Sequence, residues 1–286
     1  MVASDTVVGL VGAGILLVAL VGVFIVESRT TSTNTDLEAN SYETKVSGDV
    51  WSNRQTGTVN PANGACVAPL CAPARTSANL TLDDAPTLGS RAFYVAFLTK
   101  AGGSDPYLLG KLDASGASYK INLAPNAQDR QAWESVLITL ENSATPTTPS
   151  DRAVVAVKYG PITGDGEAND KKPVAGNGTF SLASGTAKSS LRVSGGSLTG
   201  DVSLAGATNH SGFGYRLWFR SNTTQGINYT FAGNLSGDAT KTSLSVNVQG
   251  TFDDFDQMLV TLEAVDEPTT GPAIRPGGPT VFRALV

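Results

Sequence analysis

The chain has few of the residues that catalytic and metal sites use most. Its 286 residues include one histidine, His210, and two cysteines. A nucleophile–histidine pair would have to use His210, but the segment around it, TNHSGFG, contains no nucleophile elbow. No phosphate-binding loop and no zinc-ligand cluster occurs in the sequence. We therefore interpret His210 as a solvated loop residue and predict a protein without enzymatic activity, catalytic residues, cofactor or metal.

Charge is also scarce. Charged residues make up 16% of the chain and the net charge is -5. No basic stripe is present that could neutralise phosphates, which argues against nucleic acid as a partner. Long Glu/Lys/Leu-rich stretches are missing, whereas Gly, Ser, Thr and Asn are abundant, and this composition favours an all-β fold with many turns over a helical bundle.

The two cysteines, Cys66 and Cys71, lie close together in GACVAPLCAP. They do not have the C-x-x-C spacing of redox motifs, and two thiolates by themselves make a poor metal site. In an oxidising compartment such a pair forms a small local disulfide. We predict a structural disulfide there.

One long apolar run stands at the N-terminus. The 21 residues of 6–26 carry no charge and, as a helix, would span the roughly 30 Å hydrocarbon core of a bilayer. We predict a single transmembrane helix over 6–26 after a short tail, 1–5. A cleaved signal peptide and a type IV pilin segment are the alternatives, although MVASD offers neither a basic n-region nor a charged processing site.

Small residues recur along this run, and they let another helix approach closely. The candidate helix-packing positions are Gly9, Gly12, Ala13, Gly14 and Gly22. This pattern predicts other membrane-protein subunits as partners, contacted through the helix.

Orientation in the membrane is weakly marked by charge, because only Glu27 and Arg29 flank the apolar run closely on its C-terminal side. Six Asn-x-Ser/Thr sequences and the cysteine pair favour an exported body. The six asparagines are Asn79, Asn177, Asn209, Asn222, Asn228 and Asn234. We expect a cell-membrane, single-pass protein whose C-terminal part is extracytoplasmic, periplasmic or extracellular.

The remaining sequence repeats itself at an offset of 122 residues. LITLENSATPTTP at 137–149 returns as LVTLEAVDEPTTGP at 259–272. Further matches are collinear with this one: Phe93, Val95 and Phe97 fall on Tyr215, Leu217 and Phe219, Tyr107 falls on Tyr229, and Trp133 falls on Phe255. A collinear series of this length predicts two copies of one domain.

Each copy contains short alternating runs separated by Gly, Asn, Asp and Pro, as expected of antiparallel β-sandwiches. Tyr215, Leu217 and Phe219 are expected to point inward, and Arg216, Trp218 and Arg220 outward. We predict two tandem antiparallel β-sandwich domains, at 45–163 and 171–286. A juxtamembrane linker is expected at 27–44 and an interdomain linker at 164–170.

The second copy resembles the extracytoplasmic C-terminal domain of anti-sigma-K factors. The residues that carry the resemblance are Tyr215, Leu217, Trp218, Gly233, Val260, Thr261, Glu263, Pro268, Thr269, Gly271 and Pro272. The first copy keeps the pattern more loosely, at Phe93, Val95, Thr139, Glu141, Pro146 and Thr147. The resemblance implies the β-domain and the single-span topology. It does not extend to the sigma-binding zinc domain, because only five residues precede the apolar run.

Three groups of acidic residues are candidate sites. Asp253, Asp254 and Asp256 are interpreted as a turn before the strand at 259 and not as a cation site. The run DGEAND (Asp165, Glu167, Asn169, Asp170) has no acidic residue to close a calcium loop. Glu141 and Glu263 recur at matching positions, which indicates exposed or turn-capping glutamates bound to the Pro-Thr-Thr turn.

Two functional hypotheses from different classes remain. The first is a non-enzymatic accessory or scaffold subunit whose tandem β-sandwiches brace or cover a larger membrane complex, for example a respiratory or photosynthetic one. The alternative is a cell-surface or envelope protein that binds a ligand, glycan or protein partner. A degenerate anti-sigma-like sensor is a further alternative.

Overall fold

The computed structural model describes residues 31–53, 75–100, 106–127, 133–160, 170–237, 241–270 and 274–286. Within these ranges the protein is all-β, with antiparallel sheets and no α-helix, so the expected fold class is confirmed at this level. The strands are, in chain order, β1 (Ser32–Ala39), β2 (Tyr42–Asn53), β3 (Arg75–Asp83), β4 (Phe93–Thr99), β5 (Tyr107–Lys111), β6 (Asp113–Ser115), β7 (Ser118–Ala127), β8 (Ser135–Glu141), β9 (Ala153–Lys158), β10 (Asp170–Phe180), β11 (Thr186–Ser194), β12 (Ser197–Ala205), β13 (Phe213–Thr223), β14 (Gly226–Asn234), β15 (Ser236–Gly237), β16 (Lys241–Gln249), β17 (Gln257–Ala264) and β18 (Thr280–Leu285).

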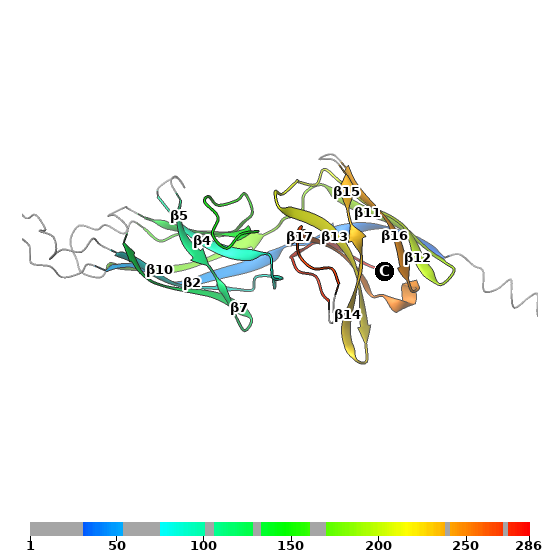
Figure 1. Ribbon diagram of the computed structural model, residues 1–286, viewed down its shortest axis with the longest axis horizontal. Helices are drawn as coiled ribbons and strands as arrows, with labels where there is room; N and C mark the ends of the chain where they lie inside the picture. Colours follow the sequence, from blue (N-terminus) through cyan, green and yellow to red (C-terminus); the bar gives the residue numbers. More distant parts are fainter. Residues whose placement is uncertain are drawn as a thin grey trace, which may run out of the picture.

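Two lobes lie side by side along the long axis of the molecule (Figure 1). The first lobe has a five-stranded sheet, in the order β10-β2-β3-β7-β6, and a four-stranded sheet, in the order β5-β4-β8-β9. The second lobe has one nine-stranded sheet, in the order β14-β13-β17-β18-β1-β11-β12-β16-β15. The overall architecture is β-sandwich-like.

The order of strands repeats between the lobes. The succession β2-β3-β7-β6 in the first lobe corresponds to β11-β12-β16-β15 in the second, and β5-β4-β8-β9 corresponds to β14-β13-β17-β18. On its other side β2 pairs with β10, a strand that follows the first repeat in the chain. On its other side β11 pairs with β1, the first described strand of the chain. Each lobe is therefore completed by a strand that is distant in sequence.

These exchanged strands form one antiparallel ribbon, which we call the central ribbon (residues 32–53 and 170–194). In the second lobe, β1 pairs with β11 from Ser32↔Arg192 to Leu37↔Ala187. In the first lobe, β2 pairs with β10 from Tyr42↔Phe180 to Ser52↔Asp170. Only two residues separate β1 from β2, so this segment passes directly from one lobe to the other (Figure 1).

Two aromatic residues mark the place where the central ribbon changes lobe. The rings of Tyr42 and Phe180 lie 6.2 Å apart, and Phe180 is fully buried. The Tyr42 hydroxyl accepts a hydrogen bond of 2.9 Å from the backbone N–H of Thr280, at the start of β18. The crossing is therefore tied both by packing and by a hydrogen bond to the second lobe.

Alternating apolar residues build the cores on either side of the ribbon. In the first lobe Val46, Val50 and Leu80 are fully buried and pack with residues of the four-stranded sheet. In the second lobe Leu198 and Val202 occupy comparable buried positions. Each such side chain stabilises the fold by about 1.5–3 kcal/mol relative to exposure.

The predicted domain boundaries are wrong in two places. Residues 32–39, expected within a linker at 27–44, form β1 and belong to the second lobe. Strand β10, expected almost wholly within the second domain, belongs to a sheet of the first lobe. The polar side chains of both segments hid these strands, because a strand with one solvent-facing row needs few apolar residues.

The described residues contain no helix long and apolar enough to cross a membrane. The predicted transmembrane segment at 6–26 and its helix-packing positions lie outside the described residues. Cys66 and Cys71 also lie outside them, as do residues 164–169 of the predicted interdomain linker.

The close approach of β2 to β3 gives a test of the ribbon. Gly48 has φ +140°, and a Cβ at this position would lie 2.0 Å from the backbone oxygen of Asn79. Gly48→Ala should lower the free energy of unfolding by about 2–4 kcal/mol, because the two strands must separate. Thermal unfolding of the full chain, followed by circular dichroism, measures this.

Gly116→Ala is the matched control. Gly116 also has positive φ, but no atom of the residues that the structure describes lies within 4 Å of the added Cβ. Gly116→Ala should lower the free energy of unfolding by only about 1 kcal/mol. Equal losses for the two variants would contradict the close approach.

Candidate functional site

Two buried glutamates occupy matching places in the lobes. Glu141 ends β8 and Glu263 lies near the end of β17, with exposed fractions of 3% and 0%. Each accepts a hydrogen bond from the threonine two residues earlier, at 2.6 Å for Thr139 and 2.5 Å for Thr261. The recurring Thr-Leu-Glu sequence therefore places a carboxylate inside each lobe.

Glu141 binds the turn that follows it. Its Oε1 accepts a 2.8 Å hydrogen bond from the backbone N–H of Ser150, which confirms the turn-capping interpretation for this residue. Arg152 Nη2 lies 3.5 Å from the other carboxylate oxygen, and the Nε of Arg152 donates to the carbonyl of Leu140 at 2.9 Å. Arg152 is itself buried, so the pair shares one site away from water.

Glu263 is held by side chains of the neighbouring strand β13. Arg216 Nη1 donates to Oε2 at 3.0 Å, and Trp218 Nε1 donates to Oε1 at 2.7 Å. Arg216 also donates to the backbone oxygens of Val265 and Glu267, at 3.2 and 2.9 Å. The arginine thus ties the carboxylate to the loop after β17.

The expectation that Arg216 and Trp218 point into solvent is wrong. Their exposed fractions are 4% and 0%. The loop after β17, which contains the second Pro-Thr-Thr sequence, is bonded to Arg216 over this face of the sheet and so removes it from water. Alternation correctly separated the two faces of β13, but it could not show that a loop covers the outer one.

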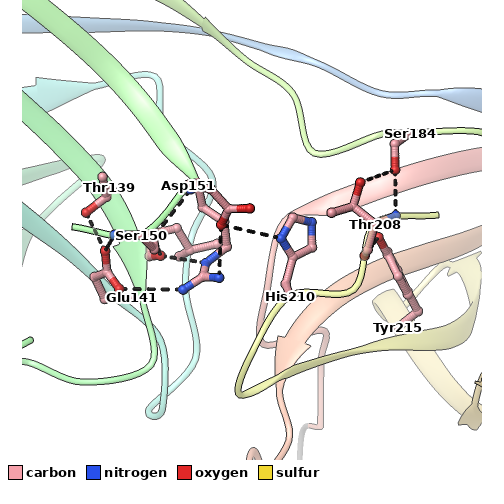
Figure 2. A network of polar contacts seen from close by, with 10 residues as sticks. Thr139, Glu141, Ser150, Asp151, Ser184, Thr208, His210 and Tyr215 are labelled. Carbon is pink, nitrogen blue, oxygen red and sulfur yellow. Dashed lines mark hydrogen bonds and ion pairs between the residues drawn. The ribbon is translucent and has the colours of Figure 1, made fainter. Parts of the chain in front are cut away.

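A polar seam joins the lobes on one side. His210, in the loop before β13, faces Asp151 of the first lobe (Figure 2). His210 Nδ1 lies 3.9 Å from Asp151 Oδ1, and the Arg152 guanidinium lies 4.7 Å from the ring centre of Phe213. A Cβ at Gly212 would meet the amide of Asn142, so the two loops are in close contact.

His210 is buried in this seam, and the expectation of a solvated histidine is wrong. Its side chain is 6% exposed, and neither ring nitrogen has a hydrogen-bond partner among the described residues. Burial lowers the pKa of His210, and the nearby Asp151 carboxylate opposes that shift. The neutral form of the imidazole is therefore favoured at this buried position.

A second seam joins the lobes through Glu267. This residue, in the loop after β17, accepts hydrogen bonds from the backbone N–H groups of Ser90 and Arg91, at 2.9 and 2.8 Å. Gly89 N–H donates to the carbonyl of Gly277 at 2.7 Å. A Cβ at Gly89 would lie 2.3 Å from the Glu267 carboxylate, so the glycine permits this contact.

The two seams pair equivalent loops, with the two lobes exchanged between one seam and the other. In the first seam the loop after β8 contacts the loop before β13. In the second seam the loop after β17 contacts the loop before β4. The repeats therefore face each other with approximate two-fold symmetry, and the Pro-Thr-Thr loops of both repeats lie at the junction.

The acidic run at 253–256 forms the predicted turn before the strand at 259. Phe252–Asp254 is a short 3-10 helix whose Asp254 carboxylate accepts from the backbone N–H of Thr251. Asp256 accepts two hydrogen bonds from Arg220, at 3.0 and 2.9 Å, and these bonds lower the pKa of Asp256. Within the described ranges, no group of three or more His, Cys, Asp or Glu is placed to hold a metal ion.

The run DGEAND lies mostly outside the described residues. Asp165, Glu167 and Asn169 fall in that part of the chain, and Asp170 begins β10.

An open groove crosses the outer face of β1, β11 and β12, with a volume of about 460 Å³. Its lining is polar and includes Asn34, Asp36, Lys188, Asp201 and Ser203. Lys188 lies 3.5 Å from Asp36, and Asp201 accepts a hydrogen bond of 2.8 Å from Ser245 on β16. Asp36 is thus paired with Lys188, whereas Asp201 is bound to a neutral hydroxyl.

No local pattern marks the residues of the seams. The partners of Asp151, Arg152 and Glu267 lie far away along the chain. A polar residue in a turn has the same local pattern whether it meets water or another lobe.

The buried carboxylate of Glu263 gives a testable prediction. Glu263→Gln should lower the free energy of unfolding by about 3 kcal/mol, because Arg216 would remain buried without its counter-charge. Urea unfolding of the full chain measures the change. Asp266→Asn is the matched control: Asp266 is 65% exposed and 3.9 Å from Arg91, so its effect should stay below about 1 kcal/mol. Similar losses for both variants would argue against a stabilising buried pair.

His210 predicts a pH dependence of stability. The folded state holds its pKa below the ordinary value of 6.5, so the unfolded chain takes up the proton first as the pH falls. The stabilising contribution is present above pH 6.5 and is lost as the pH falls toward the folded-state pKa. The midpoint of thermal unfolding should therefore drop between pH 7.5 and 5.5, and His210→Asn should drop less. Since the chain has one histidine, identical slopes would refute this assignment.

No family model, curated protein or solved structure matches this chain. The resemblance to the anti-sigma-K extracytoplasmic domain therefore stays a prediction, and the site must be interpreted from its own geometry.

Proposed function

We propose that this protein is a non-enzymatic, single-pass membrane-anchored scaffold or accessory subunit, whose two β-sandwich lobes brace or cover a larger membrane complex. The central ribbon is the observation that carries this proposal. It runs through both lobes, and the two seams tie them again on either side. A pair of lobes fixed in this way suits a structural role, because it holds two surfaces at a set spacing.

The charged clusters support the same role. Glu141, Glu263 and Asp256 each have an arginine partner within the fold. Catalytic acids need a free oxygen directed toward a substrate and a pKa suited to proton transfer. These carboxylates instead bind turns and neighbouring strands, which is a stabilising task.

The position of β1 orients the proposed assembly. The predicted membrane segment ends at Val26 and β1 begins at Ser32, so five residues join them, which reach at most about 18 Å. Because β1 belongs to the second lobe, this lobe would lie next to the membrane and the first lobe farther out. The sequon asparagines Asn79, Asn177, Asn209, Asn222 and Asn234 are exposed, as glycan acceptors on an exported body must be.

Extraction from native membranes tests the proposal. The tagged full chain, solubilised in mild detergent, should co-purify with other membrane subunits. Gly9→Leu combined with Ala13→Leu should reduce their recovery about ten-fold, corresponding to a loss of about 1.4 kcal/mol of helix packing. Val8→Leu combined with Val18→Leu is the control and should keep the partners. Recovery of the unchanged chain by itself would count against a scaffold role.

A second candidate, a surface protein that binds a glycan, is favoured by the polar groove over β1, β11 and β12. Asp36, Lys188 and Asp201 offer the hydrogen-bonding groups that a sugar needs. The same purified chain should then bind immobilised glycans, and Asp201→Ala should weaken that binding.

A further inference from the structure

Six strands lie at the edges of the described sheets, and five of them are protected. Strands β6 and β15 span three and two residues. Strand β5 has five residues and ends in Lys111. Strands β9 and β10 cover each other, since a Cβ at Gly176 would lie 2.3 Å from Val157. Short length, a charge or a covering strand prevents unwanted pairing at a sheet edge.

The sixth edge strand, β14, meets β16 near its C-terminal end, where a Cβ at Gly233 would lie 3.0 Å from Leu244. Over its remaining residues β14 has none of these features in the part of the chain that the structure describes. Its nine residues, GINYTFAGN, contain no charge and no proline. The hairpin of β13 and β14 projects away from the body of the second lobe (Figure 1). Ile227, near its tip, is 56% exposed. Natural proteins rarely leave such an edge without a partner strand.

The hairpin geometry shows which backbone groups are free. Two residues, 224 and 225, connect β13 to β14, so the pair Thr223↔Gly226 closes the turn with hydrogen bonds. Hydrogen-bonded and non-bonded pairs alternate along an antiparallel ladder. The N–H and C=O groups of Ile227, Tyr229 and Phe231 therefore point away from β13, toward the open edge.

The side chains of these three residues share one face. Phe231 lies opposite Trp218, with ring centres 5.1 Å apart, and Tyr229 lies opposite Arg220. The charge of Arg220 is already matched by Asp256. On the other face, Asn228 and Thr230 are exposed. The edge thus combines an apolar row, a polar row and free hydrogen-bonding groups.

We propose that β14 is a homotypic interface, in which the β14 strands of two copies of this chain pair antiparallel about Tyr229. In this register Tyr229 lies opposite Tyr229, Ile227 opposite Phe231, and Asn228 opposite Thr230. The residues with outward backbone groups meet each other, so each exchanges its N–H and C=O hydrogen bonds with the second copy. The two nine-stranded sheets become one continuous sheet.

The edge is complementary to itself, which is why a second copy is the occupant. Aromatic residues face β-branched or aromatic ones, and an amide faces a hydroxyl, which are favourable cross-strand pairs. No like charges meet, although each chain carries a net charge of -5. The contact is isologous and closes with two-fold symmetry, so it yields a dimer and not a fibre. It does not depend on the proposed scaffold role.

A charge-swap experiment tests the interface. The full chain in detergent should be a dimer by sedimentation. Asn228→Lys combined with Thr230→Lys places lysines opposite lysines and should raise the dimer dissociation constant at least about 100-fold. The double glutamate variant, Asn228→Glu with Thr230→Glu, should behave alike. Ser190→Lys with Ser243→Lys, on exposed faces of interior strands, is the matched control and should remain dimeric.

Mixing the lysine and glutamate variants should restore the dimer, because each lysine then faces a glutamate. Hydrogen exchange should show protected amides at Ile227, Tyr229 and Phe231 in the unchanged chain and in the mixture, and exposed amides in each variant by itself. A monomeric unchanged chain, or a dimer that persists in both charged variants, would overturn the proposal. Failure of the mixture to dimerise would overturn the register.

Discussion

The pairing of residues 32–53 with residues 170–194 is the constraint on which the rest of the structure depends. It gives β2 its neighbour in the first lobe and β11 its neighbour in the second. Neither lobe can complete its sheet from its own consecutive strands. The pairing also closes a long loop in the chain, which costs entropy that grows only slowly with length. Two extended ladders are enough to offset that cost.

The polar seams follow from this ribbon. Because the ribbon holds the lobes with approximate two-fold symmetry, the loop after β8 meets the loop before β13, and the loop after β17 meets the loop before β4. His210 and Glu267 become contact residues for this reason. Glu141 binds the loop after β8 directly, and Arg216, the partner of Glu263, binds the loop after β17, so the turn after each Thr-Leu-Glu sequence is fixed on two sides. Glu141, Glu263, Asp256 and Glu267 are each bound by groups of the fold itself.

Sequence reasoning succeeded where the signal was local. Alternation identified β13 and β17, and the 122-residue repeat identified strands that do occupy matching positions in the strand order. The turn at Asp253 was recognised from Asp chemistry. It failed for β1 and β10, whose polar outward rows resemble linkers. It also failed for Arg216 and His210, which contact segments far away along the chain, and for Trp218, whose ring packs against Phe231 of the next strand.

The sequence by itself determined the all-β class, the repeat and the scarcity of catalytic residue types, because composition and periodicity are properties of the chain. Only the tertiary structure decided which strand completes which lobe, because two strands can pair in a sheet however far apart they lie in the sequence. It also decided that Glu141 and Glu263 are buried with arginines and that His210 lies in a seam. Burial depends on what folds over a residue, and that is set only when the two lobes come together.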